Sequence, residues 1–166
     1  MKFTSHRHRS LIAVAIIMLI TAAVALAATP KAGHYTGTTN APKVHGYAAA
    51  VAFTVSANGK RVKDFQYADE GCFATMTQPP GNPFTLAGSR HALSGKAIAV
   101  SGGKFSIKNV KTTFSLSGTV TTTSVKGKFT SATNATGTIT FSQKQTAPGL
   151  NHSCGPFTRM FTATAK

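Results

Sequence analysis

Histidine is the residue type in this chain best able to act as a general acid or base. Beyond the apolar amino-terminal segment, the histidines are His34, His45, His91 and His152. Ser89 and Ser153 lie close in sequence to two of them, but catalytic triads assemble from distant segments, so this adjacency does not indicate one. The patterns G-x-S-x-G, C-x-x-C, H-E-x-x-H and the phosphate-binding P-loop are absent. We therefore expect no catalytic residues, no metal site and no cofactor, and keep a weak hydrolase as the less favoured alternative.

Carboxylates are scarce, which excludes much acid–base and metal chemistry. The chain of 166 residues has 18 Lys and Arg against three acidic side chains, Asp64, Asp69 and Glu70, and a formal net charge of +15. Paired-carboxylate glycoside hydrolysis, carboxylate-rich calcium loops and two-metal phosphoryl transfer all need more carboxylates than these. Excess positive charge instead favours association with a polyanion, although lysine also keeps surfaces soluble and protects edge strands.

Five lysines are candidates for a polyanion-binding face. Strand alternation gives four of them an outward orientation, and the fifth, Lys111, lies nearby. They are Lys104, Lys108, Lys111, Lys126 and Lys128. They share one sheet face only if their two hairpins belong to the same sheet. The expected partners are anionic cell-envelope polymers or surfaces. We expect no sequence-specific nucleic-acid binding, because that usually adds bidentate arginines or exposed stacking aromatics, and the aromatic residues here alternate into the core.

Threonine supplies a second binding hypothesis. Thr119-x-Thr121-x-Thr123 and Thr136-x-Thr138-x-Thr140 are expected to place rows of hydroxyls on outward strand faces. Such rows can bind carbohydrate, which makes a carbohydrate-binding module the alternative function. Threonine is also simply well suited to a solvent-facing strand.

The amino terminus has the organisation of an export signal. Lys2, Arg7 and Arg9 precede an apolar run from Leu11 to Ala28, which a polar segment follows. We predict a signal peptide over residues 1–27, cleaved after Ala27, and a secreted domain over residues 28–166 that is extracellular or attached to the cell envelope. The alternative is an uncleaved anchor at residues 11–28 with the domain outside, because a run of 18 apolar residues is long enough to span a bilayer. After cleavage no membrane span is expected.

Cys72 and Cys154 are the only cysteines, and exported proteins occupy compartments where disulfides persist. We predict a Cys72–Cys154 disulfide, with a redox pair or a metal site as rival interpretations. The closed loop would hold 83 residues, counting both ends, for which the chain-entropy model gives roughly 4–5 kcal/mol.

Apolar and polar residues alternate through the rest of the chain, which is the period of a half-buried β-strand. Val51, Phe53 and Val55 are expected to face inward, followed by the hairpin signal Asn58-Gly59. Further inward sets are predicted at Phe105 and Ile107; at Phe114, Leu116, Gly118 and Val120; at Val125, Gly127 and Phe129; and at Ile139 and Phe141. The pattern predicts an all-β fold, an antiparallel β-sandwich or small β-barrel of about 7–9 strands, with one amino-terminal hydrophobic helix. Residues 78–95 and 143–153 are expected to be long loops.

A bulge is predicted in the strand after Asn58-Gly59. Direct pairing across that turn places Val55 opposite Val62 but Phe53 opposite Asp64. One extra residue near Lys63 and Asp64 would bring Phe65 opposite Phe53 instead. We expect that bulge because burying the Asp64 carboxylate beside an aromatic ring would be costly.

Several spacings along the chain resemble a group of small secreted bacterial β-domains with one disulfide. In chain order they are the signal peptide, Gly33-x-Tyr35-x-Gly37-x-Thr39, an Ala/Phe/Val strand, Asn58-Gly59, a first cysteine, Gly102-Gly103-Lys104-Phe105, Cys154-Gly155 and Phe161-Thr162-Ala163. That group has no assigned activity. The resemblance covers most of the exported segment and implies a fold and a location, with no functional residues to transfer.

Overall fold

The computed structural model describes residues 28–41, 50–68, 73–75, 83–85, 90–114, 119–147 and 150–166. Within these ranges the protein is all-β, without a helix. The strands are β1 (Gly33–Thr39), β2 (Ala50–Val55), β3 (Arg61–Ala68), β4 (Phe73–Thr75), β5 (Pro83–Thr85), β6 (Arg90–Ala92), β7 (Ile98–Ser101), β8 (Lys104–Phe114), β9 (Thr119–Phe129), β10 (Asn134–Ala147) and β11 (Leu150–Ala165).

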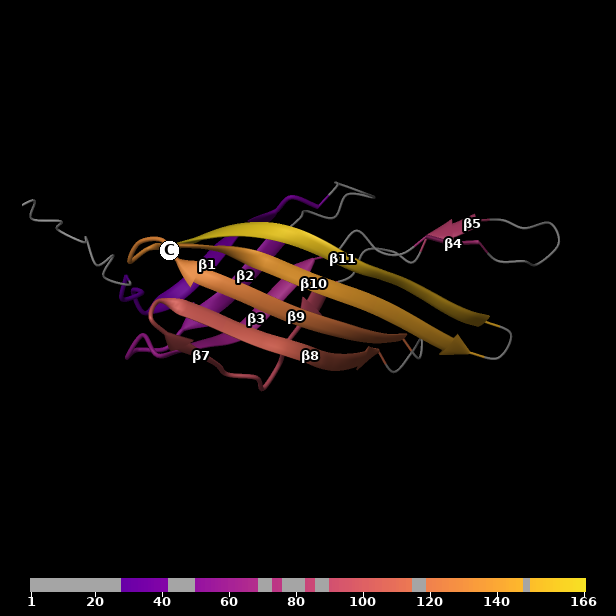
Figure 1. The fold of residues 1–166 in the computed structure, drawn as a ribbon, viewed down its shortest axis with the longest axis horizontal. Helices are drawn as coiled ribbons and strands as arrows, with labels where there is room; N and C mark the ends of the chain where they lie inside the picture. Colours follow the sequence, from indigo (N-terminus) through magenta and orange to yellow (C-terminus); the bar gives the residue numbers. More distant parts are fainter. Residues whose placement is uncertain are drawn as a thin grey trace, which may run out of the picture.

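Eight of these strands close into an antiparallel barrel (Figure 1). Each strand pairs with the next in the order β1, β2, β3, β7, β8, β9, β10 and β11, and β11 pairs back with β1. The short β6 adds to the same edge of β3 as β7, while β4 and β5 form a separate two-stranded sheet. Closure gives every strand of the ring a partner on both sides along part of its length and excludes the sandwich that the sequence also allowed.

Aromatic rings fill one half of the barrel interior. Phe53 of β2 stacks on Tyr35 of β1 and on Phe65 of β3, with centroid separations of 5.0 and 5.7 Å. Phe105 and Phe129 reach the same ring from the opposite wall at 5.7 and 6.4 Å. All five rings are buried, and the alternation predicted this for Phe53, Phe105 and Phe129. An eight-stranded barrel is just wide enough for side chains of this size to fill it.

The predicted bulge in β3 is confirmed. Val55 pairs with Val62 and Val51 with Tyr67, and the register shifts between these pairs. The backbone of Asp64 has a φ of 52°, which sets its exposed side chain outside the barrel. Phe65 consequently points inward and stacks on Phe53.

Both segments predicted as long loops contain strands, so those predictions are wrong. In residues 143–153, β10 runs on to Ala147 and β11 begins at Leu150, and the two pair as a hairpin. In residues 78–95, Pro83–Thr85 and Arg90–Ala92 are strands. The polar composition of residues 143–147 resembles that of a solvated loop, but Gln143 and Gln145 are buried and line the polar half of the barrel interior, while Thr146 is exposed.

The prediction that Thr119, Thr121 and Thr123 face outward is wrong. All three are buried, and the Thr123 hydroxyl lies 2.7 Å from the Tyr67 hydroxyl in a buried hydrogen bond. Burial alternates along β9 from Phe129 back to Thr119. Val120 therefore does not belong to the buried set, and the prediction that it faces inward is wrong. Thr136, Thr138 and Thr140 alternate with buried Ala135, Ile139 and Phe141, and they lie on the outer face as predicted.

Several predictions fall on residues outside the described ranges. The signal peptide and hydrophobic helix of residues 1–27 lie there, as do Cys72, His45 and Ser89. Cys154 is described, and its Sγ lies 3.9 Å from Gln143 Oε1. The Cys72–Cys154 disulfide stays a prediction. In the part of the chain that the structure describes, no helix is long and apolar enough to cross a membrane.

Tyr35 makes the stability of the barrel depend on pH above about 10. Its buried hydroxyl donates to the carbonyl oxygens of Ala132 at 2.7 Å and Lys31 at 3.0 Å, and burial raises the pKa of the phenol. The unfolded chain therefore loses this proton at a lower pH than the folded chain. The stabilising effect of the phenol is complete below the unfolded pKa and is lost as pH rises from that value through the higher folded pKa. We expect Tyr35→Phe to lower the free energy of unfolding by about 1 kcal/mol near pH 7, because a buried hydrogen bond is lost.

Urea unfolding of both proteins over an alkaline pH series would test this. The wild-type curve should fall more steeply than the Tyr35→Phe curve above the unfolded phenol pKa. Parallel curves would contradict the role assigned to Tyr35.

Candidate functional site

The five candidate lysines all lie exposed on β8 and β9. These strands pair directly, so their outward side chains share one outer face, called here the lysine face: Lys104, Lys108, Lys111, Lys126 and Lys128. Both hairpins therefore belong to one sheet, which is the condition that the sequence left open. The role of these lysines in binding stays a prediction.

A bulge in β8 keeps Lys111 on this face. Ile107 pairs with Val125 and Val110 with Thr123, so Lys108 and Asn109 together stand opposite Ser124. Asn109 has a φ of 54°; its backbone N–H donates to Ser124 Oγ at 3.0 Å, and Ser124 Oγ donates to Asn109 Oδ1 at 3.3 Å. In an unbroken strand Lys108 and Lys111 would point to opposite sides. This bulge was not predicted, although the three-residue step between the apolar Ile107 and Val110 signals it.

Like charges meet at one end of the lysine face. Lys104 stands directly opposite Lys128, and Lys126 follows on the same side of β9. The three side chains line a groove of about 260 Å³, the lysine groove, together with Thr136, Gly137 and Thr138. Side chains directly opposite in an antiparallel pair have Cβ atoms about 5 Å apart, and like charges there are destabilising.

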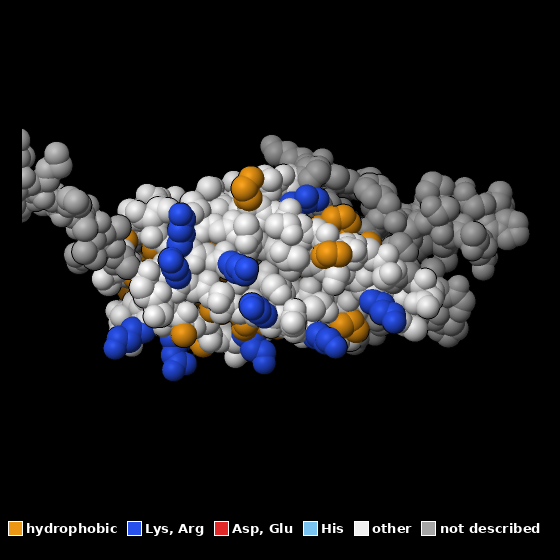
Figure 2. All heavy atoms as spheres, in the orientation of Figure 1, with side chains coloured by type: hydrophobic (Ala, Val, Ile, Leu, Met, Phe, Trp, Pro, Cys, Tyr) orange, Lys and Arg blue, Asp and Glu red, His pale blue; other side chains and the backbone are white. Residues whose placement is uncertain are grey.

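The strands of the lysine face and the strands beside them supply no carboxylate to relieve this repulsion. The five consecutive strands β8, β9, β10, β11 and β1 contain no Asp or Glu. Figure 2 shows lysine and arginine side chains across the face formed by the front strands of Figure 1, and no acidic side chain on it. The arrangement is suited to holding anionic groups, because a bound anion would offset the repulsion between the lysines.

A second groove adjoins the first on the outer face. It has a volume of about 530 Å³ and lies over β10, β11 and β1; Thr38, Thr136, Thr138 and Thr162 line it with the exposed Met160. We call it the threonine groove. Met160 is the only large hydrophobic side chain in the described part that is exposed, so no aromatic ring is available there for stacking on a sugar.

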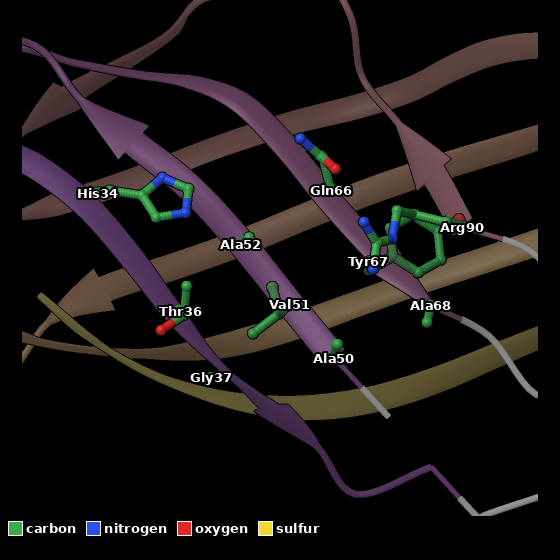
Figure 3. Close-up of a pocket in the computed structure, with 10 residues that line it drawn as sticks. All are labelled: His34, Thr36, Gly37, Ala50, Val51, Ala52, Gln66, Tyr67, Ala68 and Arg90. Carbon is green, nitrogen blue, oxygen red and sulfur yellow. The ribbon is translucent and has the colours of Figure 1, made fainter. Parts of the chain in front are cut away.

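A third groove, of about 360 Å³, lies outside β1, β2 and β3 (Figure 3). Ala50 and Ala52 form part of its floor, with His34 over one end and Arg90 toward the other. Gln66 adds an amide between them. Among the described residues, its lining has no serine, cysteine or carboxylate; it offers the Thr36 hydroxyl, the His34 imidazole and the fixed positive charge of Arg90 for binding.

His91 lies in the barrel interior and lines none of these grooves. It is 1% exposed, its ring centroid is 5.1 Å from that of Tyr67, and its Nε2 lies 3.2 Å from Gln143 Nε2. A substrate could not reach this ring without opening the barrel. The side chain of His152 lies outside the described residues. Within the described ranges, no three His, Cys, Asp or Glu side chains gather closely enough to hold a metal ion.

Comparisons of the chain with protein-family models, with curated proteins and with solved structures found no match. The resemblance to small secreted bacterial β-domains stays a prediction. Functional interpretation therefore depends on the geometry of the grooves and the lysine face.

The Asn109 bulge predicts a specific response to substitution. Asn109→Val should lower the free energy of unfolding by about 1–2 kcal/mol, because a β-branched residue tolerates a positive φ poorly. Asn109→Gly should lower it less, because glycine adopts this conformation readily. Urea unfolding of both variants, with exposed Thr113→Val as the control, checks the prediction. Equal losses in the Val and Gly variants would contradict the backbone explanation.

The Lys104–Lys128 pair predicts a gain in stability on charge reversal. Lys128→Glu should raise the free energy of unfolding by about 0.2–1 kcal/mol, because it replaces a like-charge pair with an opposite-charge pair. Lys104→Glu should act similarly, and the double variant should return close to wild type. Lys111→Glu changes the net charge equally but faces Thr122, so it controls for charge alone. The same gain from Lys111→Glu would show that pairing with Lys104 plays no part.

Proposed function

We propose that the protein is an exported, non-catalytic β-barrel domain that binds anionic polymers of the cell envelope through its lysine face. The observation that carries this proposal is the lysine groove, where Lys104, Lys126 and Lys128 converge. A purely solubilising role needs only scattered lysines. The direct opposition of Lys104 and Lys128 is destabilising, and this favours a binding role for them.

The composition of the face favours a polymer recognised by charge over a nucleic acid recognised by sequence. The strands β8, β9 and β10 contain no arginine, so bidentate contacts to bases are not available there. Among the residues whose side chains the structure describes, the aromatic rings lie in the barrel core or, for Phe157, pack against it, so they offer no platform for base stacking. Lysine acts as a compact point charge, which suits repeated anionic groups without a fixed geometry.

Export brings the domain to such polymers. The basic and apolar segment of residues 1–27 supports a cleaved signal peptide, and an uncleaved anchor at residues 11–28 would leave the barrel on the same side of the membrane. In both cases we propose that the barrel acts outside the cytoplasm. A Cys72–Cys154 disulfide would suit that compartment.

Sedimentation of the purified protein with isolated cell walls, intact or stripped of anionic polymers, tests the proposal. We expect binding that requires the polymers and weakens steeply between about 50 and 200 mM salt. Lys104→Gln, Lys126→Gln and Lys128→Gln combined should reduce the slope of log affinity against log salt by about 3, because each lysine lost removes one displaced counterion.

A matched control separates the face from overall charge. The combined variant Lys60→Gln, Lys63→Gln and Lys96→Gln removes the same number of exposed charges from the β2–β3 side and the loop before β7. It should bind nearly as the wild type does. Equal weakening by both triple variants would mean that net charge alone attracts the polymer, and absence of wild-type binding at low salt would make the lysines a solubility feature.

A further inference from the structure

The lysine groove and the threonine groove are continuous. Thr136, Gly137 and Thr138 of β10 line both, so the two hollows meet over one strand. Strand pairing extends this into a single outward row across five strands, made of Lys104, Lys128, Thr136, Thr162 and Thr38. With neighbouring strands about 4.8 Å apart, the row is about 19 Å long. Its two halves differ in chemistry, with ammonium groups at one end and hydroxyls at the other.

The hydroxyls in the threonine groove are available to a ligand. Thr38, Thr136, Thr138 and Thr162 make no side-chain hydrogen bond with another described residue. Nearby threonines outside the groove differ, since Thr140 bonds Thr158 at 3.0 Å.

The end of the threonine groove is held in place by two hydrogen bonds between Asn40 and Met160. Asn40 Oδ1 accepts the Met160 N–H at 2.8 Å, and the Asn40 N–H donates to the Met160 carbonyl at 3.0 Å. These two bonds tie the chain after β1 to β11 beside the groove, so its hydroxyls are presented from a paired sheet and not from a loop. A rigid surface of this kind loses little entropy when a ligand binds.

We propose that the ligand is an acidic polysaccharide lying along this row, with its anionic groups at Lys104, Lys126 and Lys128 and its sugar hydroxyls at Thr38 and Thr162. This inference rests on the proposed polyanion-binding function and names its ligand class. A hydroxyl-free polyanion would use only the lysine half. A neutral glycan would use only the threonine half, without an exposed aromatic ring to strengthen it.

Binding of three polymers by the purified protein tests the assignment: oligogalacturonate as acidic polysaccharide, polyphosphate of similar charge as hydroxyl-free polyanion, and dextran as neutral glycan. The threonine-groove variant is Thr38→Val with Thr162→Val, which removes two hydroxyls and keeps the β-branched shape. We expect it to weaken oligogalacturonate binding about tenfold, as the loss of two neutral hydrogen bonds predicts. Its affinity for polyphosphate should stay within about twofold of wild type. Dextran should bind far more weakly than oligogalacturonate.

Thr113→Val with Thr158→Val is the matched control, because both hydroxyls are exposed and neither lines the row. It should bind all three polymers as wild type does, and urea unfolding should show both double variants folded. If wild type binds both polyanions but Thr38→Val with Thr162→Val has no selective effect, the polysaccharide assignment fails and the polyanion function stands. If dextran binds as tightly as oligogalacturonate, the assignment also fails. If wild type binds neither polyanion at low salt, the proposed function fails as well.

Discussion

Phe53 stacks against Tyr35 and Phe65, so that three neighbouring strands contribute to one column of rings inside the barrel. Phe105 and Phe129 reach this column from the opposite wall, so the column joins β1, β2 and β3 to β8 and β9. Burial of large aromatic rings is the largest apolar contribution to the stability of a small core of this kind. The remaining geometry follows, because once these rings face inward the alternate residues must form the outer face.

Glycine connects the core to the outer grooves. A Cβ on Gly127 would overlap the Phe105 ring, and one on Gly137 would overlap the Phe161 ring and the Lys126 carbonyl. Gly127 and Gly137 pair directly across β9 and β10, so both rings can lie close to the backbone at that point. The backbone of Gly137 also lines both the lysine and the threonine groove. Close packing inside and the meeting point of the grooves outside therefore depend on the same residue.

The electrostatics of the outer face act against stability and in favour of binding. Lys104 and Lys128 repel each other in the free protein, and β8 to β11 and β1 supply no carboxylate to offset this. Such a surface gains more from an anionic ligand than a surface already neutralised by ion pairs. The polar half of the interior differs, since Tyr67 and Thr123 bond each other inside the barrel. The Tyr67 and Thr123 hydroxyls therefore satisfy each other inside the barrel, whereas those of Thr38 and Thr162 face solvent.

The sequence by itself determined which residues share a side of each strand, wherever apolar residues marked that side. Val51, Phe53 and Val55 were predicted inward on this basis, and the cost of burying Asp64 was enough to predict the bulge in β3. Where both sides of a strand are polar, alternation does not say which side is inside, and Thr119, Thr121 and Thr123 were wrongly predicted outward for this reason. Residues 143–147 were taken for part of a loop for the same reason.

Only the tertiary structure decided that the sheet closes, that β8 and β9 bring the five lysines onto one face, and that the lysine and threonine grooves meet over β10. These features depend on pairing between segments far apart in the chain, such as β1 with β11. Local alternation fixes the side of a strand to which a residue belongs, but the neighbours of that strand are set by how all the strands together bury their apolar side chains.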